Sequence, residues 1–559
     1  MLVVVHPGRT PRDAAALREV ADDGTPGRAW SVPAGELSRA VRAREDEDDA
    51  VRWVWADTAG VYRGLLRAGV RVERAHDLRL CRAILRRSTC AAGSALRAEA
   101  PGPWDAPAPQ EPPAAPTSLF DELPEQHAPA AEPDPVAELR SQLEAVAGST
   151  EPGRLRLLLA AESTGALLAA EMHADGMPWD AATHDALLTE LLGPRPLPGA
   201  RPARLESLAA ELRRALVAPT LNPDSQPDLL RALRLAGFDV ASTRRSELRT
   251  IEDPVRDVLL EYRSLSRLLS ANGWAWMDQW VHDGRFRPDY VVGGVVSGRW
   301  ATSGGGALQL PAQVRGAVRA DPGWRLVVAD AAQLEPRVLA AMSGDAAMAA
   351  AARGADLYEG VVAAGIVATR SEAKYAMLGA IYGATTGASA ALMPRLERAY
   401  PRAVALVEQA ARAGERGEVV TTWLGRSSPR PGEAFLGDLR AAAGEGAGAE
   451  EVRAARRHAR DWGRFTRNFV VQGTAAEWAL CWMASLRRRL RALEGDEGRP
   501  HLVFFLHDEV MVHTPAVLAD EVAAAVREAA VEAGRLLFGG FPVEFALQVA
   551  VVGSYDEAK

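Results

Sequence analysis

Cysteine is scarce in this chain. Only three occur in 559 residues, Cys81, Cys90 and Cys481, and no two of them have the spacing of a metal-binding pair. This excludes a disulfide-stapled scaffold and suits a reducing compartment. The chain also lacks an uninterrupted run of about 18 apolar residues, the length of a membrane span. Its first residues, MLVVVHPGRTPRDAAALREV, lack the basic start and long apolar core of a signal peptide. We therefore expect a soluble cytoplasmic protein with no membrane partner.

Positive charge is also in short supply. The 65 Lys and Arg residues are outnumbered by 73 Asp and Glu residues, which gives a formal net charge of -8. This argues against a protein held on nucleic acid by its overall charge, but it leaves room for local basic surfaces. A hydrophobic content of 48% and a charged content of 25% are ordinary for a soluble globular protein. At this length we expect about two to four subdomains.

The residue pattern changes along the chain and predicts an α+β fold. Strand-like and helix-like segments form a small N-terminal α/β unit, and a Pro- and Ala-rich stretch follows that cannot form regular ladders. Apolar residues then recur at helical spacing, before strands return on both sides of a long helical block. A sheet assembled from separated segments is typical of α+β proteins. The predicted units are 1–99 (α/β domain), 100–135 (linker), 136–285 (helical) and 286–559 (sheet, with helices inserted at about 345–460).

Two acidic residues stand at the ends of apolar strands. Asp330 ends the strand in RLVVAD, and Asp508 occupies the turn of the strand–turn–strand segment VFFLHDEVMVH. If the strands are neighbours in one sheet, the two carboxylates meet at its rim and repel each other unless a cation lies between them. Mg²⁺ suits such a place, and two ions about 3.5–4 Å apart can clamp both oxygens of a phosphoryl transfer. Taken alone, each residue is better explained as a helix cap or a surface turn.

A helical stripe supplies groups that suit a nucleotide. In TRSEAKYAMLGAIYGATTGAS, Arg370, Lys374, Leu378 and Tyr382 follow one another every four residues and share one side of a helix. Two cations one turn apart suit a triphosphate, and the tyrosine ring suits a base or a sugar. The alternative is a solvated basic helix whose tyrosine lies in the core.

A second stripe carries long polar side chains. Arg464, Asn468 and Gln472 also recur every four residues, which is unusual for a helix that faces a core. Such donors can check base-pair geometry in the minor groove, because every correct pair presents acceptors there.

In their order along the chain, these segments resemble the motifs of the family A DNA polymerases, the group of bacterial DNA polymerase I. VVSGRWATSGGGALQLP is similar to T-x-T-G-R…L-Q-N-I-P, and VVADAAQLEPRVL is similar to D-Y-S-Q-I-E-L-R. RSEAKYAMLGAIYG resembles R-x3-K-x6-Y-G, NFVVQGTAAE resembles N-x-P-x-Q-G-T-A-A-D, FFLHDEVMV resembles V-H-D-E, and GSYDEAK resembles G-x-N-W-x-E-A. The likeness spans about 154–559. It implies a right-hand polymerase with an antiparallel palm sheet and helical fingers and thumb.

The resemblance implies a role for each matching position. Two Mg²⁺ ions, which Mn²⁺ can replace, would be held by Asp330, Asp508 and the Ala331 carbonyl, with Glu509 and Lys374 as further catalytic groups. The phosphates of the incoming dNTP would be bound by Arg370, Lys374, Gln333 and Tyr358. Its sugar would contact Leu378 and Glu335, and Glu335 would block a 2′-OH. Tyr382 would stack beside the templating base. Primer-template DNA would contact Arg299, Gln309, Arg464, Asn468, Gln472 and His507.

Several positions depart from the family pattern. Leu378 stands where the family has an aromatic ring against the nucleotide sugar, and Tyr358 replaces a histidine at the phosphates. Ala331 and Ala332 replace Tyr-Ser, and Leu310 replaces an Asn. We interpret the chain as a divergent but active polymerase, because both metal carboxylates and both phosphate-binding cations are present.

The N-terminal unit resembles the second half of the family's 3′–5′ exonuclease domain. Tyr62 stands where that domain has an acidic residue, and no D-x-E motif occurs on an early strand, although Asp77 remains. One carboxylate cannot hold two metal ions, so we predict that proofreading is lost. We also expect that no 5′-nuclease region precedes this unit.

The linker contains one apolar segment, PTSLFDEL. It resembles the peptides that bind the bacterial sliding clamp, through Leu119 and Phe120. An apolar tether that folds back on the protein explains the segment equally well.

The predicted function is DNA-directed DNA synthesis on a primer 3′-OH by a monomer, in repair or gap filling. One alternative is a catalytically weak DNA-binding scaffold derived from a polymerase. Another is a single-subunit RNA polymerase, against which Glu335 argues.

Overall fold

The computed structural model describes residues 1–6, 13–33, 35–47, 50–106, 134–354, 356–383, 387–443, 448–495 and 498–558, with only the backbone for residues 309, 387, 388 and 443. The chain forms two compact units. The first comprises Met1–Asp175, Asp289–Thr302 and Val327–Ala550, and the second comprises Gly176–Pro288, Ser303–Leu326 and Val551–Lys559. Within the described residues, no helix combines the length and the apolar character needed to span a membrane.

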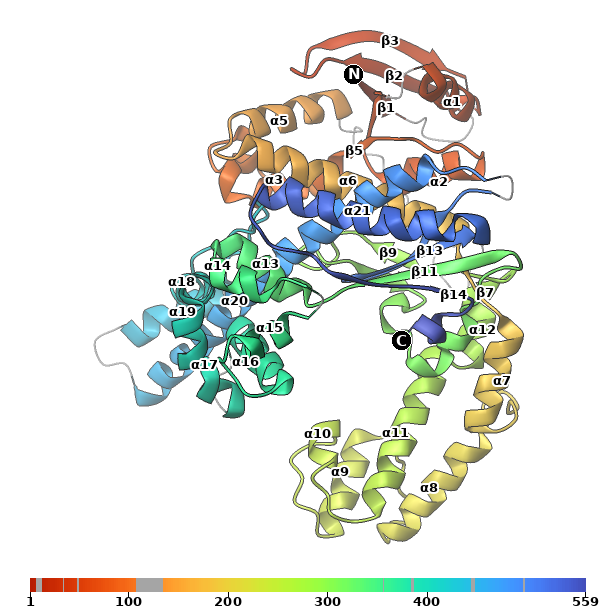
Figure 1. Ribbon diagram of the computed structural model, residues 1–559, viewed down its shortest axis with the longest axis vertical. Helices are drawn as coiled ribbons and strands as arrows, with labels where there is room; N and C mark the ends of the chain where they lie inside the picture. The colour runs from red at the N-terminus through yellow and green to blue at the C-terminus, as the bar shows by residue number, and fades with distance from the viewer. Residues whose placement is uncertain are drawn as a thin grey trace. The chain divides into compact units, whose positions relative to one another are not determined.

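The first unit begins with a five-stranded sheet in the order β3-β2-β1-β4-β5 (Figure 1). β1 (Leu2–His6) pairs antiparallel with β2 (Ala15–Val20) and parallel with β4 (Arg52–Trp55), so it lies in the interior of the sheet, where residues 2–5 are buried. The predicted strands near 2–5 and 51–57 are therefore neighbours. The other elements here are β3 (Pro26–Val32), α1 (Leu37–Glu47), α2 (Thr58–Arg67), β5 (Ala75–Asp77), α3 (Leu78–Arg87), η1 (Thr89–Ala91), α4 (Ala95–Ala98) and η2 (Pro103–Asp105).

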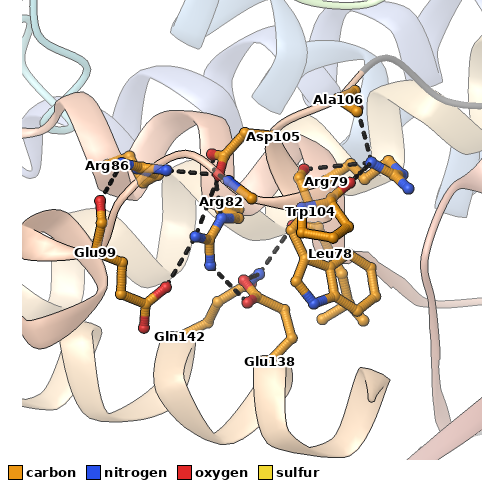
Figure 2. Close-up of polar contacts among 12 residues, drawn as sticks. Leu78, Arg79, Arg82, Arg86, Glu99, Trp104, Asp105, Ala106, Glu138 and Gln142 are labelled. Atoms are coloured by element: carbon orange, nitrogen blue, oxygen red, sulfur yellow. Dashed lines mark hydrogen bonds and ion pairs between the residues drawn. The ribbon is translucent and has the colours of Figure 1, made fainter. Parts of the chain in front are cut away.

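A buried arginine ties the end of this region to helix α5 (Pro135–Ala147). Arg82 of α3 forms ion pairs with Glu138 at 2.7 Å, Glu99 at 2.9 Å and Asp105 at 3.2 Å (Figure 2). Three carboxylates offset the loss of hydration of the guanidinium group. The chain is thus held against α3 both before and after 107–133, the part of the predicted linker that lies outside the described residues.

A second, four-stranded sheet positions the candidate site. Its order is β12-β13-β11-β14, so β11, the strand that contains Asp330, lies beside the β12–β13 hairpin, whose turn carries Asp508 (Figure 1). The hairpin is antiparallel, with Phe505 opposite Val510 and Leu506 opposite Glu509. Helix α21 packs against β13, and α20 packs against β12. The strands are β11 (Trp324–Ala331), β12 (His501–Leu506), β13 (Glu509–Pro515) and β14 (Leu547–Val552).

Helices make up the rest of the first unit. Met377 and Ile381 of α16, Val407 of α18 and Phe469 of α20 are all buried in one apolar core, which fixes these three helices on each other. The elements are α6 (Pro152–Asp175), β9 (Asp289–Val291), α13 (Leu334–Ser343), α14 (Ala346–Ala351), α15 (Leu357–Ala363), α16 (Arg370–Tyr382), α17 (Gly387–Ala399), α18 (Pro401–Glu415), α19 (Glu433–Ala443), α20 (Ala449–Arg491), η5 (Ala516–Leu518) and α21 (Ala519–Phe538).

The second unit is mainly helical, as the apolar spacing predicts. Trp179 packs at 5.1 Å from Trp276 and 5.7 Å from Phe286, ring centre to ring centre, so aromatic side chains join its helices to a small sheet. The elements are β6 (Met177–Pro178), α7 (Ala181–Leu192), α8 (Ala203–Ala215), α9 (Gln226–Leu235), α10 (Arg245–Leu248), α11 (Val255–Asn272), α12 (Trp274–Trp280), β7 (Val281–His282), β8 (Arg285–Phe286), η3 (Ala307–Gln309), η4 (Ala312–Ala317) and η6 (Tyr555–Ala558); β10 (Ala301–Gly304) belongs to both units.

Candidate active site

Asp330 and Asp508 meet at one end of the four-stranded sheet. The Ala331 amide donates a hydrogen bond to the Asp508 carbonyl at 2.8 Å, which holds the end of β11 against the β12–β13 turn. Burial, together with the negative charge of Asp330, raises the pKa of the Asp508 carboxyl to about 7. The prediction that the two strands are neighbours is therefore confirmed.

Two residues beside these carboxylates have strained backbones. His507 has φ of 56° and Gln333 has φ of 49°, and they are two of four described non-glycine residues with positive φ. Such conformations cost about 1–2 kcal/mol for residues with a Cβ and are kept where the surrounding structure requires them. At His507 the chain turns so tightly that the Asp508 amide donates to the Leu506 carbonyl at 2.6 Å.

A pocket opens next to the carboxylates and is lined by several distant segments of the first unit. It joins the end of the hairpin to the starts of α13 and α15, the last turns of α16 and the middle of α20. Its lining residues are Gly298, Arg299, Trp300, Gln333, Leu334, Glu335, Pro336, Tyr358, Leu378, Tyr382, Ala475, Ala476, Leu480, Phe505, His507 and Asp508. Burial lowers the pKa of His507, and the nearby Arg299 charge lowers it further, so this imidazole favours its neutral form.

Glu335 spans this pocket. One carboxylate oxygen forms an ion pair with Arg299, and the other accepts a hydrogen bond from the Tyr382 hydroxyl at 2.6 Å. Burial, together with the hydrogen bond to Glu335, raises the pKa of Tyr382 to about 12. Gln472 of α20 also reaches the Tyr382 hydroxyl. Tyr382 is 36% exposed, which is inconsistent with the alternative that it is a core residue.

Gln333 and Arg337 form a buried polar cluster behind the pocket. The Gln333 side-chain oxygen accepts from the Leu357 amide at 3.2 Å and from Arg337 at 3.4 Å. Arg337 is completely buried and donates to the carbonyls of Ala332 at 2.8 Å and Glu544 at 2.7 Å, among others. Arg337 was not predicted from the sequence as a residue that organises the site. An arginine on the apolar face of a helix was the signal for it.

Helix α16 presents its two cations to solvent. The helix starts with a capping box in which the Thr369 hydroxyl accepts from the Glu372 amide at 3.2 Å. Arg370 pairs with Asp356 at 2.8 Å and lies 5.6 Å from the centre of the Tyr358 ring, so any anion that binds here competes with a carboxylate. Lys374 is exposed one turn further on.

The polar residues Arg464, Asn468 and Gln472 lie along α20 from the surface to the pocket. Gln472 contacts the pocket through Tyr382, Asn468 is half-buried, and Arg464 is exposed and paired with Asp461. Among the described residues, the buried Asn468 Oδ1 has no hydrogen-bond partner.

The remaining predicted residues lie beside the carboxylates, in the second unit or outside the described residues. Glu509 is buried on β13, directly after Asp508. Gln309 belongs to the second unit, and its side chain is outside the described part of the structure. Leu119 and Phe120, the proposed clamp-binding residues, also lie outside the described residues.

The N-terminal sheet brings Asp57, which follows β4 and caps α2, near Asp77 at the end of the neighbouring strand β5. Tyr62 is fully buried and donates to Glu171 of α6 at 2.5 Å. Asp77 caps α3 and accepts from the Thr58 hydroxyl at 2.7 Å; burial raises its pKa to about 6. Within the described ranges, no group of three or more His, Cys, Asp or Glu residues is placed to hold a metal ion.

A sequence model described as DNA polymerase family A matches residues 225–552, more than half of the chain. The chain belongs to this family. The resemblance seen in its motifs is thus confirmed. DNA polymerase I of Chloroflexus aurantiacus is 29% identical over 335 residues, 55% of this chain and 33% of that protein. Thermostable DNA polymerase I of Thermus filiformis is 27% identical over 329 residues, 53% of this chain and 35% of that protein. The chain therefore matches about a third of the length of these relatives.

The fold agrees with the family. The POL domain of Pol1 from M. smegmatis, solved in complex with DNA primer-template and dNTP, superposes with a TM-score of 0.64. The comparison covers 100% of this chain and 95% of that one at 18% identity. The predicted α+β class is confirmed, and within it the four-stranded sheet corresponds to the palm of a family A polymerase.

Proposed function

We propose that this family A protein is a DNA-directed DNA polymerase that adds deoxynucleotides to a primer 3′-OH and releases pyrophosphate. The observation that carries the proposal is the meeting of Asp330 and Asp508 at one end of the palm sheet, beside a pocket spanned by Glu335. Nucleotidyl transfer needs carboxylates on a rigid frame next to a nucleotide-sized hollow, and strand ends provide such a frame.

The two carboxylates fit divalent cations. They lie close enough for Asp330 to raise the pKa of Asp508, and a cation between them would remove that repulsion. Asp330, Asp508 and the Ala331 carbonyl would hold two Mg²⁺ ions, which Mn²⁺ can replace; few protein ligands are needed because Mg²⁺ retains water and binds substrate phosphates. When bound, the ions would stabilise the attacking and leaving oxygens of the transferred phosphoryl group.

The pocket residues would hold the incoming nucleotide. Glu335 is oriented from both sides, by Arg299 and by Tyr382, so its carboxylate can exclude a ribose 2′-OH without moving. Arg370 would exchange Asp356 for the triphosphate, which the forked guanidinium binds well, and Lys374 would assist. Leu378 would line the sugar side of the pocket, and Tyr358 the phosphate side.

Primer-template DNA would lie along the palm and α20. Gln472 and Asn468 would contact the minor groove of the nascent pair, His507 and Arg299 would contact the primer end, and Arg464 would contact a phosphate, with Gln309 as a further contact. Neutralised phosphates make such binding weaken steeply with salt. The overall acidic charge does not oppose this, because the contacts are local.

The N-terminal domain would not proofread. Support comes from Tyr62, which donates a hydrogen bond to Glu171, and from Asp77, which caps α3. Such a polymerase would suit gap filling during DNA repair. It would work in the cytoplasm as a monomer, with primer-template DNA and dNTPs as its substrates.

Primer extension on a gapped template tests the proposal. The wild-type protein with Mg²⁺ and four dNTPs should fill the gap, and Asp508→Asn should reduce the rate at least about a hundredfold, since it removes a charge needed in the transition state. Glu418→Gln, which alters an exposed carboxylate paired with its neighbour Arg416, is the control and should extend normally. If the wild type fails to extend with either Mg²⁺ or Mn²⁺ yet binds the DNA, the chain is a scaffold instead.

A further inference from the structure

A turn at 421–427 connects the N-terminal domain to the pocket. The Ser88 hydroxyl donates to the Gly425 carbonyl at 2.7 Å, and the Thr89 amide donates to the Ser427 hydroxyl at 2.9 Å. The Thr89 and Thr421 hydroxyls lie 2.8 Å apart. Ser88 is fully buried, so its bond cannot be replaced by water at no cost. We call Ser88 and Thr89 the docking pair.

The turn carries an arginine that is buried on the other side. Arg426 forms an ion pair with Glu162 of α6 at 2.7 Å, and the two side chains are 11% and 1% exposed. Burial raises the pKa of Glu162, although the Arg426 charge opposes the rise. A buried ion pair tolerates little displacement, because separating its charges leaves each without water or partner.

This ion pair packs directly against the main chain that leads to Arg299. A Cβ on Gly298 would lie 2.6 Å from the Arg426 Nε, and a Cβ on Gly293 would lie 2.5 Å from a Glu162 carboxylate oxygen. Both glycines have positive φ, 87° and 61°. The loop 293–298 therefore follows the ion pair closely, and only glycine permits that approach.

The same turn also rests on α20 beside Gln472. Glu477 accepts from the Leu424 amide at 2.9 Å and from the Thr422 hydroxyl. At Gly473 a Cβ would collide with the Thr422 side chain and would lie 3.1 Å from the Ser297 carbonyl. The turn thus touches two segments that reach the pocket. One is the loop before Arg299, which pairs with Glu335, and the other is the turn of α20 that carries Gln472, which contacts Tyr382.

We propose that the N-terminal domain acts as a brace for the polymerase pocket. The docking pair holds the turn 421–427, the turn holds Arg426 against Glu162, and this ion pair holds the loop that ends at Arg299, the partner of Glu335. This gives a function to a domain whose nuclease residues are otherwise engaged. The catalytic consequence rests on the proposed polymerase function, whereas the mechanical link does not. The members of the docking pair are positioning residues.

The first test is the sugar selectivity of the double variant Ser88→Ala, Thr89→Val, which keeps the packing but removes both hydroxyls. The ratio of kcat/KM for dNTP to that for the matching NTP should fall about fivefold, the factor expected from losing one to two buried hydrogen bonds. Thr89→Ser, which keeps the hydroxyl, should behave like the wild type. Thr164→Val is the matched control, because its hydroxyl donates to the Ala160 carbonyl one turn earlier in α6, at 2.9 Å. A merely structural role would lower both rates equally, so an unchanged ratio overturns the proposal.

The second test does not depend on catalysis. Hydrogen–deuterium exchange of amides in 293–300 should become faster in the double variant and in the single variant Thr89→Val, while the β12–β13 hairpin keeps its wild-type protection. Unchanged exchange in 293–300 together with faster exchange in 421–427 would show that the turn moves without the loop, and the brace would be wrong. If the wild type synthesises no DNA, the proposed function fails, and the exchange result still decides the brace.

Discussion

The Tyr382 hydroxyl donates to Glu335 at 2.6 Å and joins the last turn of α16 to the first turn of α13. Arg299 pairs with the other oxygen of the same carboxylate. A charge held from two sides cannot easily swing aside, so in the proposed polymerase this contact would link the choice of sugar to the position of α16.

Removing this carboxylate should relax sugar selection. We expect Glu335→Ala to raise kcat/KM for ribonucleotides at least about tenfold relative to deoxynucleotides, since the pocket gains room at the 2′ position. Single-nucleotide incorporation with dNTP and NTP measures the ratio. Glu397→Ala, at an exposed position of α17, is the control. An unchanged ratio would show that Glu335 does not select the sugar.

A flat ring at position 378 should strengthen nucleotide binding. Leu378 lines the pocket, where the family has an aromatic residue, and a leucine offers bulk without a stacking face. Leu378→Phe should lower KM for dNTP about threefold with kcat little changed, in steady-state incorporation. Leu378→Met adds no ring and should leave KM unchanged. If Phe brings no gain, the pocket is built around leucine.

The buried carboxyl of Glu477 makes stability depend on pH. Burial raises its pKa to about 7 from an ordinary 4.5, so the folded protein holds this proton more tightly than the unfolded chain does. Its contribution is present in full below pH 4.5 and is lost as pH rises through 7, by on the order of 3 kcal/mol. Denaturant unfolding at pH 5 and pH 8 should show a smaller drop for Glu477→Gln than for the wild type. Equal drops in the two proteins would contradict the assignment.

Arg337 should be a major determinant of stability. Its guanidinium donates to the carbonyls of Ala332, Ala352, Gly354 and Glu544, and methionine would leave the buried carbonyls of Ala332 and Ala352 unpaired. We expect Arg337→Met to cost at least about 3 kcal/mol of unfolding free energy, measured by denaturant titration. The exposed Arg402, which donates to one carbonyl at 3.1 Å, provides the control: Arg402→Met should cost less than about 1 kcal/mol.

Mismatched primers test the predicted loss of proofreading. A primer with a mispaired 3′ end should persist unshortened when incubated with the protein, Mg²⁺ and no dNTP, because Tyr62 and Asp77 are both held in structural bonds. Gel analysis of the labelled primer resolves the question. Stepwise shortening that Asp77→Asn abolishes would mean that a nuclease site remains.

The sequence alone determined the local features. Asp330 and Asp508 follow apolar strand patterns, and the capping box at Thr369 and the four-residue spacing of Arg370, Lys374 and Tyr382 define one helix. These features are readable because strand period, helix period and capping depend on residues a few positions apart. Motif order then indicated the family, which residues 225–552 confirm.

Only the tertiary structure decided which polar groups share partners. The bonds from Tyr62 to Glu171, from Tyr382 to Glu335 and from Ser88 to Gly425 join residues separated by 109, 47 and 337 positions. No periodicity links such positions, and their pairing depends on burial, since a buried polar group must find whichever partner the packing supplies. The sequence thus specified the elements and the acidic strand ends, while packing specified the polar contacts that hold the pocket together.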